Sequence, residues 1–388
     1  MPTINLPDTT GRLIRYTVPE PRTYDTAKPG EPLPRLVLAA AHVVVDPLAD
    51  NSPWSDAAID YDASIRFREH LWDLGLGVAE SMDTAQRGMG LDWPHARELA
   101  LATLAAARAR PHARVYVGVG TDQLDPNGAS LDDVIRAYLE QMEAIQVAGG
   151  RLIVMASRAL ARAAKGPADF AAVYARILQA ADRPVILHWL GPMFDPALAG
   201  YWGTSDVPAA MDHCLDVLAA NAAKIEGIKI SLLDKDLEIA MRRRLPAGIR
   251  MYTGDDYNYP ELIAGAEGVS SDALLGIFDP IAPVASAALK ALGNQGPAEF
   301  RRILDPTVAM SREIFKAPTW FYKTGVVLIA HLGGHQKHFA MLGGQQSARS
   351  AVHLARVFQL GAELGLFPDT DRAAQRMSRI LSIYGIEP

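Results

Sequence analysis

Lys229 lies in an apolar run that resembles a β-strand, "IEGIKIS" at 225–231. Burying an ammonium group is costly because an apolar core cannot replace its hydration. Burial also favours the neutral form of an amine, and a neutral amine can attack a carbonyl carbon to form a Schiff base. The structural alternative is an ion pair with Asp255 or Glu80. Residue type and position alone leave both readings open.

Other polar side chains stand at or just after the ends of apolar runs. If these runs are the parallel strands of a barrel, their carboxyl-terminal ends meet at the face where barrel enzymes place their chemistry. The sequence therefore predicts a polar site there, with these members beside Lys229: His42, Glu80, Ser81, His188, Trp189, Asp255 and Asp256.

The elements that would position these residues are short apolar runs, rich in β-branched or aromatic residues and bounded by Gly, Pro or charge. Such runs are typical of buried parallel strands. Helical patterns separate them, as at 93–110 and 131–150, and no glycine-rich dinucleotide turn follows the first run. We therefore predict a (β/α)8 TIM barrel. The eight runs are 35–45, 75–81, 114–120, 151–157, 184–191, 226–231, 249–255 and 268–277.

The chain divides into three parts by composition. Residues 1–35 are rich in Pro, Thr and charge and predict an extended N-terminal arm. Residues 36–297 carry the alternating pattern of the barrel. From 298 to 388 the pattern is helical throughout and predicts a C-terminal helical extension.

Composition narrows the class of protein. The 388 residues carry a net charge of −6 with both signs interspersed, which does not favour a nucleic-acid partner. We expect no membrane span, because no apolar run approaches the length that a spanning helix needs. The N-terminus does not resemble a signal peptide, and the single Cys214 cannot form an intrachain disulfide. A cytoplasmic location is expected.

Several motifs occur together in one order. "GIK" at 227–229 is followed by "GDD" at 254–256 and by "GAEGVSS" at 265–271, while "VGVG" at 117–120 and "AGGRLIVMAS" at 148–157 come earlier. In this order the motifs resemble those of the dihydrodipicolinate synthase and N-acetylneuraminate lyase superfamily, over roughly residues 36–330. These are class I aldolase barrels. The resemblance implies that Lys229, on the sixth strand, is the Schiff-base lysine.

The departures from this family concern the substrate. Family members carry a tyrosine near the end of strand five as a proton relay, and "ILHWLGPMFDP" places His188 there instead. A histidine can relay protons because its usual pKa lies near operating pH. The carboxylate-gripping arginine of that motif has no equivalent, and the family's "GTTGE" appears as "GVAES" at 77–81. The lysine is kept while the substrate grip has changed.

These observations predict a lyase acting on a keto acid or a sugar-derived carbonyl compound through Lys229, with His188 as relay. Glu80, Ser81, Asp255, Asp256, His42 and Trp189 would shape the substrate site. The resemblance implies no organic cofactor, and a homodimer or homotetramer.

Two alternatives remain open. His42, Glu80, His188 and Asp255 offer nitrogen and carboxylate ligands for a divalent metal ion, as in barrel lyases or isomerases of keto sugars. In that case Lys229 would stabilise an enediolate rather than bond to the substrate. A barrel that binds its ligand without catalysis is the other alternative.

Overall fold

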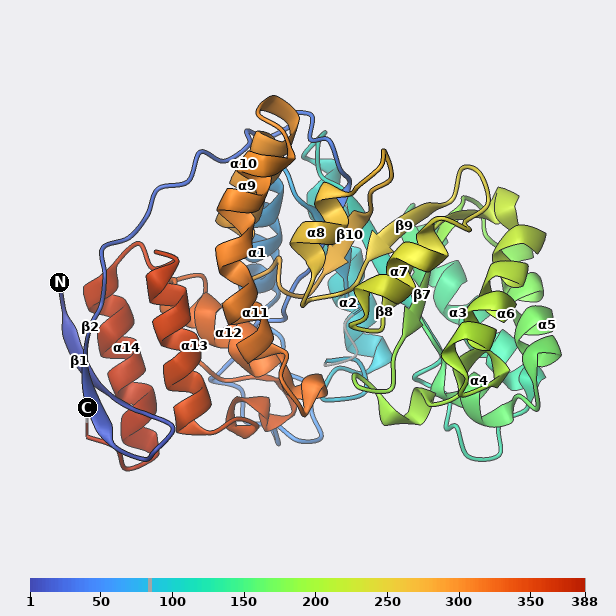
Figure 1. Ribbon diagram of the computed structural model, residues 1–388. Helices are drawn as coiled ribbons and strands as arrows, with labels where there is room; N and C mark the ends of the chain where they lie inside the picture. Colours follow the sequence, from blue (N-terminus) through green and yellow to red (C-terminus); the bar gives the residue numbers. More distant parts are fainter. Residues whose placement is uncertain (83–85, 388) are drawn as a thin grey trace.

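The computed structural model describes residues 1–82 and 86–387. Eight parallel strands form a closed barrel, confirming the predicted fold class, and each lies within or overlaps one of the eight predicted runs (Figure 1). They follow one another around the barrel in chain order, and the last pairs with the first. The strands are β3 (Val37–Ala40), β4 (Gly77–Glu80), β5 (Val115–Val119), β6 (Arg151–Val154), β7 (Val185–Leu190), β8 (Ile225–Ser231), β9 (Arg250–Thr253) and β10 (Asp272–Leu275).

Alternation along each strand divides its side chains between two apolar clusters. One fills the barrel interior and includes Leu38, Ala79, Tyr116, Ile186 and Tyr252. The other lies between the strands and the surrounding helices. Because successive strand residues face opposite sides, each residue's place in the alternation decides whether it can reach the interior.

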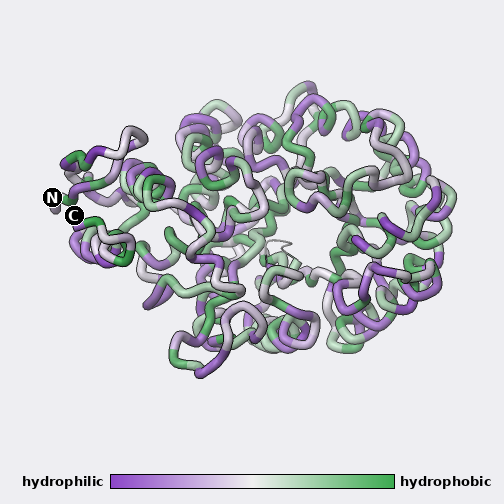
Figure 2. The backbone as a smooth tube through the Cα atoms, turned by 90° about the horizontal axis from the view of Figure 1, so that it is seen from below, coloured by the Kyte–Doolittle hydropathy of each residue, from purple (hydrophilic) through white to green (hydrophobic). Residues whose placement is uncertain are grey.

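Helices follow the strands and surround the barrel. Several begin with a side-chain cap: at α3, Ser130 and Asp133 form a reciprocal capping box, which satisfies the first backbone N–H groups. Hydrophilic and hydrophobic positions alternate along the backbone of the helices (Figure 2). The helices are α1 (Tyr61–Asp73), α2 (Trp93–Arg108), α3 (Leu131–Val147), α4 (Arg158–Ala163), α5 (Pro167–Gln179), α6 (Val207–Ala220), α7 (Lys235–Arg242), α8 (Tyr259–Ala264) and α9 (Ala282–Asn294).

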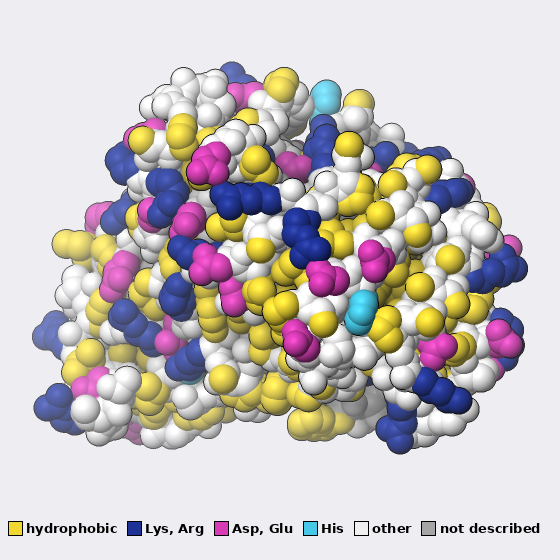
Figure 3. Space-filling model, turned by 45° about the vertical axis from the view of Figure 1, so that its right-hand side comes forward, with side chains coloured by type: hydrophobic (Ala, Val, Ile, Leu, Met, Phe, Trp, Pro, Cys, Tyr) yellow, Lys and Arg dark blue, Asp and Glu magenta, His cyan; other side chains and the backbone are white. Residues whose placement is uncertain are grey.

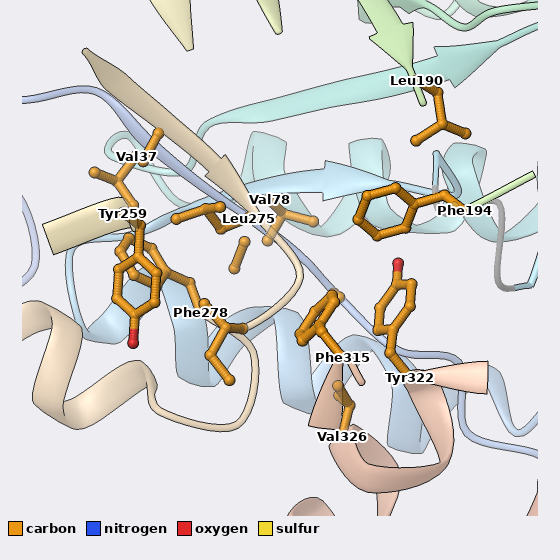
Figure 4. Packing of buried hydrophobic residues seen from close by; sticks show 14 of the residues in the cluster. Val37, Val78, Leu190, Phe194, Tyr259, Leu275, Phe278, Phe315, Tyr322 and Val326 are labelled. Carbon is orange, nitrogen blue, oxygen red and sulfur yellow. The ribbon is translucent and has the colours of Figure 1, made fainter. Parts of the chain in front are cut away.

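The predicted helical extension is present, and it packs against the barrel. Phe315 and Tyr322 stack at 4.3 Å between ring centroids, and Phe194, from the loop after β7, lies 6.4 and 6.2 Å from them (Figure 4). Both rings also lie against Gly276, which follows β10. The extension therefore covers part of the carboxyl-terminal end of the barrel. Its helices are α10 (Pro297–Leu304), α11 (Val308–Ile314), α12 (Lys323–Leu332), α13 (Ala351–Glu363) and α14 (Thr370–Ile383).

The N-terminal arm contains more structure than the sequence predicted. Strands β1 (Thr3–Pro7) and β2 (Leu13–Thr17) pair as an antiparallel hairpin, and β1 packs on α13 and α14. The hairpin and these two helices lie side by side at the left of Figure 1. The arm then runs to α9, where the Ala27 amide donates to Ser286 Oγ at 2.9 Å. The first and last parts of the chain thus share one core.

Short 3-10 helices complete the described structure: η1 (Pro196–Leu198), η2 (Tyr201–Gly203), η3 (Ala222–Lys224), η4 (Asp305–Thr307), η5 (Thr319–Phe321) and η6 (Leu342–Ser347). Across 1–82 and 86–387, every helix is too short or too polar to cross a lipid bilayer. On the face shown in Figure 3, acidic and basic side chains are interspersed.

Candidate active site

Lys229 lies on β8, the sixth barrel strand, and its side chain is only 7 % exposed. It pairs in register with His188 on β7 and with Tyr252 on β9. Gly254, just after β9, leaves room for it: a Cβ on Gly254 would lie 2.7 Å from Lys229 Cε and 2.5 Å from the Ile230 carbonyl oxygen. The glycine of the "GDD" motif therefore makes space for the lysine.

His188 lies beside Lys229 and is 2 % exposed. Its Nε2 is 3.2 Å from Ser231 Oγ, while its buried Nδ1 has no hydrogen-bond partner in the described chain. Burial, together with the charge of Lys229, holds the pKa of His188 well below its usual value of 6.5. The imidazole is therefore neutral at pH 7, with one ring nitrogen left for a ligand or substrate.

Asp255 and Asp256 follow Gly254 directly, and both are buried. Asp255 accepts hydrogen bonds from the backbone amides of Tyr257 and Asn258, at 2.8 and 3.0 Å. Burial raises its pKa above the usual value. Asp256 accepts the Ile277 amide at 3.0 Å and so connects the loops after β9 and β10. These contacts order the loop next to the lysine.

Glu80 does not face the barrel interior. Ala79 does, so Glu80 points outward toward the helices, where Arg68 of α1 donates to it at 2.8 and 2.9 Å and Thr103 of α2 at 2.6 Å. These contacts, with the charge of Arg68, lower the Glu80 pKa although burial opposes them. Ser81 donates its amide to the same carboxylate at 2.9 Å. The carboxylate is occupied by these contacts.

Among the described residues, the contacts of His42 and Trp189 are with partners other than Lys229. His42 is fully buried after β3, with Nδ1 2.8 Å from Asp279 Oδ2, and that pairing helps to lower the Asp279 pKa. Trp189 follows inward-facing His188 and so faces outward. It lies edge-on to Trp202, 6.3 Å between ring centroids, in the outer cluster.

The four side chains considered as metal ligands are therefore separated. His42, Glu80 and Asp255 each engage partners of their own, on different sides of the barrel wall or in different loops. In residues 1–82 and 86–387, no three His, Cys, Asp or Glu side chains are grouped so that they could hold an ion.

Two groups at this end of the barrel were not singled out from the sequence. Arg158, which begins α4 after β6, pairs with Asp195 at 2.6 Å and borders a cavity of about 140 Å³ together with Thr121 and Met155. Lys323 of α12 is fully buried, and its Nζ donates to the Ala40 carbonyl at the end of β3 at 2.6 Å. Lys323 comes from outside the barrel repeat, so strand periodicity gives no signal for it.

The sequence matches one protein family over residues 4–386, nearly its whole length. The chain belongs to the DUF993 family. This family is described as a protein of unknown function. No curated protein sequence matches the chain.

Solved structures similar to this DUF993 chain are dihydrodipicolinate synthase-like barrels. A putative dihydrodipicolinate synthetase from Pseudomonas aeruginosa has a TM-score of 0.62 at 15% identity, covering 86% of this chain and 99% of its own. The Cyanidioschyzon merolae enzyme, solved with lysine bound, has a TM-score of 0.64 at 15% identity, covering 86% of this chain and 99% of its own. YagE of Escherichia coli K12, in complex with pyruvate, has a TM-score of 0.62 at 14% identity, covering 91% of this chain and 99% of its own. At these identities the likeness establishes the fold.

Proposed function

We propose that this DUF993 protein is a class I aldolase or lyase-type enzyme that forms a Schiff base between Lys229 and a small carbonyl substrate. The observation that carries the proposal is the placing of Lys229: a buried amine on the sixth strand, with a glycine opposite its Cε and a neutral histidine beside it. Glu80, one of the two carboxylates considered as an ion-pair partner of Lys229, is instead engaged by Arg68 and Thr103.

In the proposed reaction, Lys229 Nζ attacks the carbonyl carbon, and the carbonyl oxygen leaves as water after accepting protons. The resulting iminium withdraws electrons from the adjacent carbon, so that a neighbouring C–C or C–O bond can break or form. Neutral His188 accepts a proton in one direction and returns it in the other. Ser231, 3.2 Å from His188 Nε2, orients the ring.

The substrate class follows from the groups near the carboxyl-terminal end of the barrel. We propose a 2-keto acid or a keto sugar as substrate, because the 140 Å³ cavity is lined by polar groups that include Thr121 and the ion pair of Arg158 with Asp195. Asp255 and Asp256 hold the loop next to the lysine, and Ser81 and Glu80 support the wall behind it. Pyruvate, with which one similar barrel was solved, belongs in the panel of candidates, while the changed substrate grip favours a different carbonyl compound.

We further propose a homo-oligomer in the cytoplasm. A single buried cysteine, Cys214, is compatible with a reducing compartment. Sedimentation of the purified protein would give the number of copies in the assembly, and a monomer at all concentrations would contradict the proposed dimer or tetramer.

Borohydride trapping tests the Schiff base. Wild-type protein is incubated with pyruvate, other 2-keto acids and keto sugars, reduced with borohydride, and weighed by intact-mass spectrometry. One carbonyl compound should add its own mass less one oxygen atom, because the imine loses water and is then reduced. Peptide mapping should place the adduct on Lys229.

Lys229→Ala should show no adduct. Lys235→Ala is the matched control. Lys235 is a partly exposed lysine that follows the same strand and forms an ion pair with Glu261. This variant should form the same adduct as wild type. An adduct that persists in Lys229→Ala, or an equal adduct on several surface lysines, would refute the proposal.

A further inference from the structure

A cavity of about 750 Å³ lies at the end of the barrel opposite the candidate active site. Its lining includes residues at the amino-terminal starts of β5, β6, β8, β9 and β10 and just before β3 and β7. Arginines dominate this lining: Arg35, Arg108, Arg114, Arg151, Arg183 and Arg250. Among the described residues of the lining, two carboxylates, Glu226 and Asp272, accompany them.

Both carboxylates are already engaged. Asp272 accepts the Leu36 amide and Arg250, each at 2.8 Å. Glu226 accepts the hydroxyls of Tyr116 and Tyr252 at 2.7 and 2.9 Å and lies 3.5 Å from Arg151. The acidic groups therefore neutralise two of the six arginines.

The other four arginines make no ion pair among the described residues, although the charge of Asp272 also acts on Arg35. Arg35 and Arg108 donate to backbone carbonyls, and Arg183 makes one long contact of 3.5 Å to the Gly149 carbonyl. The guanidinium group of Arg114 makes no hydrogen bond or ion pair with the described residues, and only the Arg114 carbonyl is engaged, by the Val78 amide at 2.8 Å. Carbonyls satisfy donors but do not cancel charge, so six guanidinium groups face two carboxylates around one cavity, and a bound anion would reduce the repulsion between the arginines.

We infer that this cavity, hereafter the basal cavity, binds a small organic phosphate or polyphosphate. The planar forks of arginine match phosphate oxygens with paired hydrogen bonds, which favours phosphate over a simple halide. The volume is within the range of small-molecule sites. Apolar side chains on one wall, Leu33, Leu36 and Leu104, leave room for an organic moiety beside the phosphate.

This inference is independent of the proposed Schiff base. The barrel interior separates the two ends, with Tyr116 and Tyr252 bridged by Glu226 at the floor of the basal cavity. Lys229→Ala should therefore bind at the basal cavity as wild type does, whatever becomes of trapping at Lys229.

Calorimetric titration of the full chain with inorganic pyrophosphate, at constant ionic strength, tests the inference. Wild type should bind about one pyrophosphate per chain. Arg114→Ala and Arg183→Ala should each weaken binding by about tenfold or more, the loss expected for one charge-assisted contact. Both arginines are exposed and make few contacts, so their removal should leave folding intact.

Arg162→Ala is the matched control, because Arg162 is an exposed arginine of α4, which follows the carboxyl-terminal end of β6. It should bind pyrophosphate as tightly as wild type. Three results would overturn the inference: equal affinity in all four proteins, tight binding of citrate but not of pyrophosphate, or a change of oligomeric state in the Arg114 and Arg183 variants without a change in affinity.

Discussion

At the residue scale, Gly254 has the most sharply defined role. A Cβ there would lie 2.5 Å from the Ile230 carbonyl oxygen, a backbone atom that cannot rotate away, and would also meet Ser231 Oγ and Lys229 Cε. Gly254→Ala should therefore lower the free energy of unfolding by about 1–3 kcal/mol, as overpacking of a dense core does. Urea unfolding measures this change.

The control for Gly254 is Gly166→Ala, whose Cβ would meet nothing within 4 Å and whose φ of 175° any residue adopts. That variant should change the unfolding free energy by less than about 1 kcal/mol. Two equally stable alanine variants would show that the space opposite Lys229 is not confined.

The same residues show how far sequence reasoning reaches. Lys229 and His188 could be placed together because each lies near the carboxyl-terminal end of a recognisable apolar run, and the two strands are neighbours. Glu80 could not be placed from its run alone. Its direction depends on the alternation set by Ala79, and its partners Arg68 and Thr103 come from two helices whose rotation no local pattern fixes.

At the element scale, the hairpin β1–β2 is the part that composition misrepresented. Residues 1–35 are rich in Pro, Thr and charge, which predicts an extended arm, yet Leu6 of β1 is fully buried in the main core. Tyr16 of β2 also packs edge-on to Phe358 of α13, at 6.1 Å. The apolar partner that orders the hairpin lies more than 300 residues away, where no local pattern can reveal it.

Truncating Leu6 tests whether the hairpin belongs to the cooperative fold. Leu6→Ala should cost about 2–4 kcal/mol of unfolding free energy, because it removes a buried side chain and leaves a cavity. Leu13→Ala in β2, where the side chain is 51 % exposed, should cost well under about 1 kcal/mol. If both variants unfolded at the same urea concentration, the hairpin would be only loosely attached.

At the scale of the whole molecule, buried titratable groups act on stability in opposite directions. Burial and the charge of Arg376 lower the pKa of His331 to about 4, and His188 is lowered as well. In the unfolded chain these histidines take up a proton near pH 6.5, whereas in the folded protein they stay neutral to a lower pH. Their contribution to the unfolding free energy is therefore fully present above pH 6.5. It is lost as the pH falls through about 4.

Glu238 of α7 acts with the opposite sign. It is 1 % exposed, and burial raises its pKa from 4.5 to about 7, although Ser271 donates to it at 2.6 Å. The folded protein therefore holds this proton where the unfolded chain has released it. The contribution of protonated Glu238 to the unfolding free energy is complete below pH 4.5 and is lost as the pH rises through about 7.

Glu238→Gln should remove this loss, because an amide accepts the Ser271 hydrogen bond at every pH and never ionises. Between about pH 5 and about pH 8, the unfolding free energy of wild type should fall relative to the variant by on the order of 3 kcal/mol. Urea unfolding across this range measures it, with Glu143→Gln, at an exposed position of α3, as the control. Parallel pH profiles for wild type and Glu238→Gln would mean that the carboxyl group is hydrated in solution and titrates as it does in the unfolded chain.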